Sequence, residues 1–497
     1  MVPVGSATTA VPEEEAPRQH YRVTFGVLAM GTLAYVLMQS MVLPALGTIQ
    51  HDLHTSQEAV AWLLSAFLVS SSVATPILGR MGDMFGKEKM LVVMLAVLAA
   101  GTALGGLAGS LWLLIVARVI QGVAGAVFPL SFGIIRDEFP AEKVAGGIGL
   151  ISTLLGIGSG VGIIVGGPVV QHLSYHWLFW IPLPLVVAAL VAAIRFVPES
   201  PVKTPGKVDV RGAVALSAWL VALLVGITQG PTWGWGSPGV VGLLVATVGF
   251  FVLWVRVELR ARQPLVDMRL MRIPTVWWTN VAALLFGVGM YASIVVLPPF
   301  VEIPARTGYG FGASATMAGV FLVPSAMAML VVGLFNGRIT GALGAKGSLV
   351  LSGVVSAVPF GVLALAHGSP WEVYATSAFS GLGVGLGFAA LTNLVVDAVP
   401  PTVTGVATGM NANVRTIGGA VGSQVVASIL TAGVLASGYP SERSFGIAFG
   451  FMAVSFVLAT LAAVVVPVAR RAAEAAPPGG SRRVPIGLGT GQPMDVR

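Results

Sequence analysis

The chain carries two glycine-rich stretches that align without a gap at an offset of 258 residues, Gly79-Arg-Met-Gly-Asp-Met-Phe-Gly86 and Gly337-Arg-Ile-Thr-Gly-Ala-Leu-Gly344. Each stretch follows a long apolar run, 57–79 in the first case and 314–335 in the second. Glycine permits the backbone conformations that a tight turn between two helices requires. The pair therefore predicts one structural unit that occurs twice in the chain.

Four downstream positions strengthen this repeat. At a uniform offset of 260 residues, Pro140, Gly149, Gly158 and Gly162 recur as Pro400, Gly409, Gly418 and Gly422. With 64 glycines in the chain, one match would carry little weight. Two ordered sets at nearly the same offset indicate that the first six predicted spans recur as the last six, with two helices inserted between them.

Composition indicates a protein that lies mostly in lipid. Of the 497 residues, 56% are hydrophobic and 9% are charged, whereas soluble domains carry about 25% charged residues. A span needs about 20 mostly apolar residues. We predict an all-α integral membrane fold with fourteen spans, near residues 23–47, 57–79, 90–108, 111–135, 145–170, 177–197, 212–229, 238–255, 275–300, 314–335, 348–367, 371–396, 403–433 and 445–468.

The domain organisation follows from the repeat and the spans. We predict a six-helix bundle over 21–200, two inserted helices with flanking loops over 201–272, and a second six-helix bundle over 273–469. Segments 1–20 and 470–497 are rich in proline, glycine and charge, which predicts disordered tails.

Basic residues orient the spans. With the N-terminus inside, 23 of the 27 Lys and Arg residues fall in inner loops and tails, and only Arg306 and Arg443 fall outside. Because basic residues are retained on the cytoplasmic side, we expect both termini in the cytoplasm, in a multi-pass protein of the cytoplasmic membrane. The first apolar run, from Val23, lacks a signal-peptide cleavage site.

Several classes of chemistry are excluded or disfavoured. The chain has no cysteine, so disulfides, thiol catalysis and iron–sulfur clusters are excluded. The six histidines are too scattered to predict a metal site. The sequence shows no constellation of nucleophile and base that would predict an enzyme, and no nucleotide-binding motif that would predict an ATP-driven pump. The net charge of +7 is explained by the inner loops rather than by nucleic acid. We expect no cofactor and a monomeric chain whose partners are the lipid bilayer, protons and a small lipophilic substrate, with the proton motive force as energy source.

The stretch from Gly79 through Asp83 and Gly86 to Lys89 resembles the loop motif between spans 2 and 3 of the major facilitator superfamily, and the whole chain resembles its fourteen-span drug:proton antiporter branch. The resemblance implies that Asp83 latches the two halves on the cytoplasmic side, with Arg136 as a candidate partner. The alternative is a solvated loop carboxylate.

Span 4 contains a second motif that resembles this family. Arg118, Gln121, Gly122 and Gly125 share one helix face. An arginine within a span costs about 2.5 to 3.5 kcal/mol on insertion scales, so its presence suggests function. The resemblance implies proton coupling by Arg118 together with Asp83. The alternative is a structural arginine bonded to backbone carbonyls of a broken helix.

Span 5 carries a glycine series that resembles the antiporter motif of the family. One departure is Ile163, where a proline is expected. The resemblance implies a sliding gate, and the alternative is simple tight packing. The predicted gate residues are Gly149, Gly158, Gly162, Gly166 and Gly167.

The central cavity is predicted to differ from that of the family. Met38 stands where fourteen-span members usually carry Asp, and no predicted span centre holds Asp or Glu. The substrate is thus expected to be neutral, lipophilic or anionic. Asn411 and Arg415 form a candidate polar anchor, although a structural role for Arg415 is equally open. The cavity candidates, each of which could instead be ordinary packing, are Tyr35, Met38, Gln39, Gln121, Phe286, Tyr291, Phe321, Met327, Asn411 and Arg415.

The resemblance implies a proton-driven exporter of small lipophilic compounds, such as an antibiotic or related metabolite, that works by alternating access. Two alternatives stay open at this point: a translocator of lipids or cell-envelope precursors, and a membrane receptor or scaffold that transports nothing.

Overall fold

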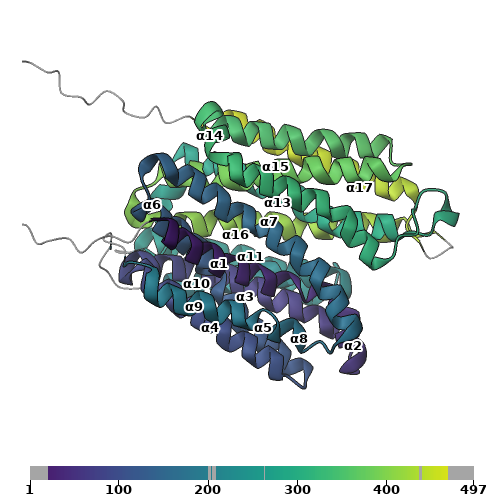
Figure 1. The fold of residues 1–497 in the computed structure, drawn as a ribbon, viewed down its shortest axis with the longest axis horizontal. Helices are drawn as coiled ribbons and strands as arrows, with labels where there is room; N and C mark the ends of the chain where they lie inside the picture. Colours follow the sequence, from purple (N-terminus) through teal and green to yellow (C-terminus); the bar gives the residue numbers. More distant parts are fainter. Residues whose placement is uncertain (1–20, 200–202, 204–208, 262–263, 436–438, 468–497) are drawn as a thin grey trace, which may run out of the picture.

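The computed structural model describes residues 21–199, 203, 209–261, 264–435 and 439–467. Within these residues the secondary structure is helical, apart from one isolated bridge between Val434 and Pro440. Two groups of roughly parallel helices lie one above the other, with α7 and α16 between them (Figure 1). The predicted tails 1–20 and 470–497 lie outside the described residues.

The first group of helices covers the predicted N-terminal bundle. The helix of span 1 breaks after Ser40, near Pro44, which cannot donate a backbone hydrogen bond. The elements are α1 (Tyr21–Ser40), η1 (Leu43–Ala45), α2 (Leu46–Asp52), α3 (Gln57–Phe85), α4 (Lys87–Leu107), α5 (Leu111–Val123), η2 (Ala124–Ala126), α6 (Val127–Glu138), α7 (Ala141–His172), α8 (Trp177–Trp180) and α9 (Leu183–Phe196).

The remaining elements include the inserted pair α10 and α11, followed by the second group. They are α10 (Val210–Trp233), α11 (Pro238–Arg260), α12 (Met268–Met271), α13 (Pro274–Glu302), η3 (Ala305–Thr307), α14 (Ala315–Leu365), α15 (Pro370–Ala398), η4 (Pro401–Val403), α16 (Thr404–Ala432) and α17 (Glu442–Val465).

Each predicted span coincides with helix, but the predicted number of fourteen is not confirmed. Among the described residues, twelve helices are long and apolar enough to cross a membrane. Two features separate this number from fourteen. α14 counts once although it has 51 residues and a non-helical backbone at Gly344 (φ 70°, ψ 166°), and α16, which carries Asn411, Asn413 and Arg415, is not among the twelve.

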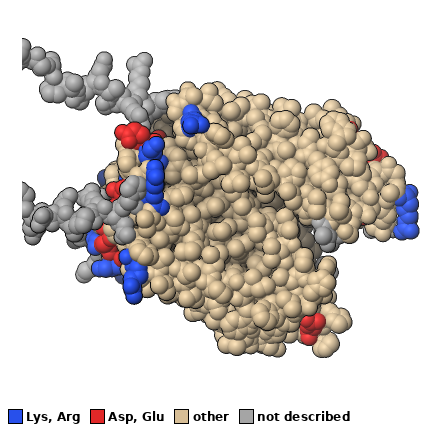
Figure 2. Space-filling model, viewed as in Figure 1, with Lys and Arg blue, Asp and Glu red and all other residues tan. Residues whose placement is uncertain are grey.

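Charged side chains gather at one end of the molecule, at the left in Figure 2, and a broad uncharged surface covers the middle of this face. We call this end the charged end. It holds the turns between α3 and α4, α6 and α7, and α15 and α16. At the opposite end, serine side chains accept a hydrogen bond from the first turn of five helices, which fixes where these helices begin. These serines are Ser56, Ser110, Ser237, Ser314 and Ser441.

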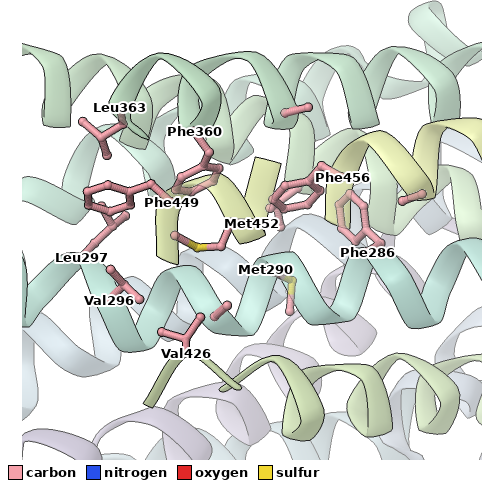
Figure 3. Packing of buried hydrophobic residues seen from close by; sticks show 14 of the residues in the cluster. Phe286, Met290, Val296, Leu297, Phe360, Leu363, Val426, Phe449, Met452 and Phe456 are labelled. Carbon is pink, nitrogen blue, oxygen red and sulfur yellow. The ribbon is translucent and has the colours of Figure 1, made fainter. Parts of the chain in front are cut away.

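The hydrophobic core is divided between the two groups. One cluster of buried residues lies wholly within 282–466, and Figure 3 shows the aromatic stack at its centre, which includes Phe286, Phe360 and Phe456. A second cluster lies within 27–197, with Val396 as its one member from the other group. The boundaries predicted at residues 200 and 272 stay a prediction.

The sequence repeat corresponds to a repeat of helix contacts. Gly158 and Gly162 of α7 lie against Val36 and Ser40 of α1. Their counterparts Gly418 and Gly422 of α16 lie against the backbone oxygens of Leu284 and Val288 in α13. The two glycines that end the repeated stretches, Gly86 (φ 117°) and Gly344 (φ 70°), both have positive φ, which side chains other than glycine's rarely allow.

Candidate substrate cavity and the contacts between the halves

A cavity of about 70 Å³ lies between the two groups of helices. It is lined from the first group by α1, α3, α6 and α7, and from the second by α13, α15 and α16. Pockets for drug-sized ligands enclose about 300 to 1,000 Å³. This conformation therefore holds the central cavity nearly closed.

Five of the predicted cavity residues line this cavity, Tyr35, Gln39, Tyr291, Asn411 and Arg415. The Tyr35 hydroxyl lies 2.9 Å from the Ser71 hydroxyl of α3. The Asn411 side-chain amide donates to the side-chain oxygen of Asn280 in α13 over 2.8 Å. Both halves thus contribute polar groups to one space.

The other five predicted cavity residues lie elsewhere. Phe286 is fully buried against Phe456 in the core of the second group, as Figure 3 shows, and Phe321 stacks on Tyr374 with ring centroids 4.2 Å apart. The Met327 side chain is 56% exposed on the outer surface. Met38 and Gln121 are buried, but on the far side of α1 from the cavity, as described next.

Arg118 is fully buried and holds the broken end of α1. Its guanidinium donates to the backbone oxygen of Met38 over 2.7 Å, to that of Leu63 over 3.0 Å and to the Gln121 side chain over 3.0 Å. Gln121 in turn donates to Thr102, and both donate to the Met38 sulfur. Because the last carbonyls of a helix lack intrahelical donors, Arg118 satisfies the acceptors that the break exposes. These hydrogen bonds match the alternative in which Arg118 is a structural arginine bonded to backbone carbonyls of a broken helix.

Arg415 differs from Arg118 in its hydrogen bonds. Both guanidinium groups lie over a phenylalanine ring, Arg118 over Phe67 at 4.2 Å and Arg415 over Phe388 at 4.1 Å from the centroid. Among the residues that the structure describes, no oxygen accepts a hydrogen bond from Arg415 and no carboxylate pairs with it. Its side chain lines the cavity, and of the described lining residues it alone is charged.

Asp83 joins the two halves at the charged end. Its carboxylate, from α3, accepts from the backbone N–H of Gly405 over 3.3 Å and of Val406 over 3.2 Å, in the first turn of α16. The first N–H groups of a helix lack internal partners and carry partial positive charge. Asp83 is 1% exposed, which excludes the solvated-loop alternative. A Cβ on Gly79 would lie 2.8 Å from the Gly405 oxygen, so glycine permits this close approach.

Arg136 forms no direct ion pair with Asp83, although Asp83 is one of three carboxylates that interact with it electrostatically. It donates to the Thr404 hydroxyl over 2.6 Å and to the Val399 backbone oxygen over 2.8 Å, because it lies beside the turn that precedes α16. The ion pair of Asp83 is with Lys87, whose ammonium lies 3.9 Å from Asp83 and 2.6 Å from Asp137. The sequence reasoning missed this buried pair; the spacing of Asp83 and Lys87 at i and i+4 was its one available signal.

A second contact between the halves joins α7 to α14. Asn336 of α14 lies against Gly149 and donates to the Ala145 backbone oxygen over 3.2 Å, and Gly337 lies against Gly146. Of the five predicted gate glycines, only Gly149 faces the other half. Gly158, Gly162 and Gly166 pack on residues 36–44 of the first half, and a Cβ on Gly167 would meet nothing within 4 Å.

Comparison with known proteins agrees with this arrangement. Residues 28–423 match the family model described as Major Facilitator Superfamily. The chain belongs to the major facilitator superfamily.

The relatives of this facilitator include named exporters. The "Tetracenomycin C resistance and export protein" of Streptomyces glaucescens is 30% identical over 425 residues, which cover 83% of this chain and 76% of the relative. "Multidrug resistance protein 3" of Bacillus subtilis is 29% identical over 417 residues, with 82% and 79% covered.

A solved structure shares the fold. The crystal structure of the human organic anion transporter MFSD10 superposes with a TM-score of 0.63 at 15% identity, over 90% of this chain and all of that chain. Together with the described helices, these findings make the chain a multi-pass membrane transporter.

Proposed function

We propose that this facilitator is a secondary active transporter that exports small lipophilic compounds, an antibiotic, drug or related metabolite, across the cytoplasmic membrane by proton-coupled alternating access. The observation that carries this proposal is a cavity between two repeated halves, closed at the charged end by Asp83 against α16. The names of the export and resistance relatives support the substrate class.

The proposed topology has fourteen spans with both termini in the cytoplasm. The two segments of α14 on either side of Gly344 count as separate spans, and α16 counts as a span despite its polar side chains. Basic residues concentrated in the loops of the charged end support a cytoplasmic position for that end.

Asp83 is the proposed site of proton coupling. A proton on its carboxylate removes the negative charge that the N-terminus of α16 stabilises and weakens both N–H···O contacts. The halves then separate at the charged end and open the cavity toward the cytoplasm. A pH gradient supplies the work, as does the membrane potential at about 2.3 kcal/mol per charge per 100 mV.

An Asp83→Asn variant tests this coupling. Asparagine retains the size of the side chain but carries no charge, so we expect pH-gradient-driven transport in proteoliposomes to fall about tenfold or more, which corresponds to the loss of about 1.4 kcal/mol or more in charge-assisted hydrogen bonds. The transported compound is first identified by growth of a pump-deleted host on an antibiotic panel.

The matched control is Asp52→Asn, because the Asp52 carboxylate lies at the opposite end of the molecule with a 41% exposed side chain. The control should transport normally. Equal gradient-driven transport by Asp83→Asn and the unmodified chain would exclude Asp83 as the coupling site.

A second candidate function is lipid translocation. An apolar groove of about 580 Å³ lies between α10 and α16, lined by residues that include Ile227, Trp235, Val421 and Val425. It is larger than the central cavity, and its apolar lining suits an acyl chain. A lipid-scrambling assay with purified protein separates the two candidates, since an exporter of small compounds leaves labelled lipids in their leaflet.

A further inference from the structure

We propose that the central cavity selects aromatic compounds that carry an ionised acidic group, a carboxylate or phenolate, and that Arg415 binds this group. The inference deepens the proposed export function, because it rests on the cavity as the substrate site. It follows from the charge of the cavity, the free hydrogen-bond donors of Arg415 and the aromatic lining.

The charge of the cavity is positive. Arg415 is the one charged residue in the lining, and among the described residues no Asp or Glu contributes to it. A guanidinium stays protonated in proteins, so Arg415 cannot lose its charge when water leaves the cavity. An unpaired charge in a low-dielectric space is costly. A bound anion removes this cost, whereas a cationic compound increases it.

The donors of Arg415 are available to a ligand. The comparison with Arg118, the other arginine that falls within a predicted span, shows this. Arg118 uses its Nε and Nη1 donors on two backbone oxygens and on Gln121, and its Nη2 alone has no partner among the described residues. Arg415 makes no such bond among the described residues; it lies over the face of Phe388, and Tyr291 is its electrostatic neighbour.

The Phe388 contact also orients Arg415. A guanidinium that lies over the face of an aromatic ring keeps its N–H edge free for a bidentate bond to a carboxylate or phosphate-like oxygen pair. A lysine ammonium offers neither the stacking nor the fork. Arginine is thus the residue that this recognition requires.

The lining favours a flat aromatic body beside the acidic group. Five rings contribute to the cavity from both halves, those of Tyr35, Phe128, Phe132, Tyr291 and Phe388. Aromatic side chains pack on aromatic ligands in offset-stacked or edge-to-face geometry. Asn411 adds a polar group from α16.

The test uses three naphthalene compounds that share the ring system and carry a negative, a neutral and a positive substituent at the same position: 2-naphthoate, 2-naphthamide and 2-naphthylmethylammonium. Their affinities for the purified full-length chain are measured by calorimetry at neutral pH. A charge-assisted bidentate bond contributes about 1.5 to 3 kcal/mol, so we expect naphthoate to bind about tenfold or more tightly than the amide. The ammonium compound should bind more weakly than the amide.

Variants connect this preference to Arg415. Arg415→Gln should reduce naphthoate to the affinity of the amide, and Arg415→Lys should restore part of the difference. The matched control is Arg338→Gln, because Arg338 also stacks on a phenylalanine, Phe335 at 5.7 Å, but is exposed outside the cavity. The control should retain the full preference.

Two outcomes would overturn the inference: naphthoate binding no tighter than the amide, or a preference that survives in Arg415→Gln. The ligand series on the unmodified chain decides the first even if Arg415 variants fail to fold. Binding is measured without a gradient, so loss of proton-driven export with an intact anion preference would contradict the proposed function and leave this inference standing.

Discussion

Arg118 and Met38 show how a single residue substitution changes the environment of a buried arginine. Met38 stands where the resemblance leads us to expect an aspartate, and its sulfur accepts from Thr102 and Gln121. Arg118 donates to backbone oxygens. Among the described residues no carboxylate pairs with this cation, which connects α1, α3 and α5.

An Arg118→Lys variant separates a structural from a coupling role. A single ammonium cannot reproduce the guanidinium's contacts with Met38, Leu63 and Gln121, and unsatisfied buried acceptors cost about 1 to 3 kcal/mol. We expect a loss of thermal stability in detergent of about 2 kcal/mol. Unchanged stability together with lost pH-driven transport would instead assign Arg118 to proton coupling.

Some of the cavity residues could be predicted from the sequence, and there is a physical reason why the others could not. A helical pattern gives the face on which Tyr35, Gln39 and Arg415 lie, because polar side chains in an apolar span seldom face lipid. The same helical pattern does not show whether an apolar ring packs in the core or lines a cavity. Phe286 and Phe321 were therefore assigned to the cavity, although they pack inside the second group.

At the scale of helices, glycines decide how closely two spans cross. Gly418 and Gly422 bring α16 onto the backbone of α13, where a Cβ would lie 2.0 and 2.2 Å from carbonyl oxygens. A backbone atom cannot move away as a flexible side chain can. These crossings tolerate no side chain, whereas Gly167 of α7 faces open space.

Alanine substitutions test this difference. Gly418→Ala should destabilise the protein by about 1 to 3 kcal/mol because the added methyl forces α13 and α16 apart. Gly167→Ala should be neutral or stabilising by up to about 1 kcal/mol, since alanine favours helix and meets no neighbour. Thermal unfolding of both variants gives the comparison, and equal effects would show that the crossing is not tightly packed.

Most helices could be predicted from the sequence, because the length of each apolar run, the serine caps and the prolines are local features that determine where a helix begins and ends. Each predicted span lies in helix. What hydropathy alone leaves unsettled is the number of crossings, because Gly344 divides one long helix without a polar loop and α16 carries polar residues that face the cavity. Contacts such as Lys87 with Asp137 depend on the packing of α4 against α6, which sequence patterns do not contain.

At the scale of the whole molecule, the topology can be tested with introduced cysteines, because the chain contains none. His51→Cys and Gly368→Cys place a thiol at the end opposite the charged end, and Glu142→Cys and Gly341→Cys place one at the charged end. A membrane-impermeant thiol reagent should label the first two in intact cells and the second two after permeabilisation. Labelling of Gly341→Cys from outside would contradict the proposed fourteen spans.

The inserted helices α10 and α11 affect how the two halves can separate. Their cluster includes Leu216, Leu220 and Trp254, and it packs against Val73 and Ile77 of α3 as well as Val406 and Met410 of α16. The pair therefore bridges the seam that Asp83 closes. When the halves separate there, we expect α10 to slide along either α3 or α16. Its apolar face then shields the open seam from the lipid. At the second seam, between α7 and α14, the described contact between the halves is the uncharged one that Asn336 makes with Ala145, so we expect the seam closed by Asp83 to be the one that responds to protonation.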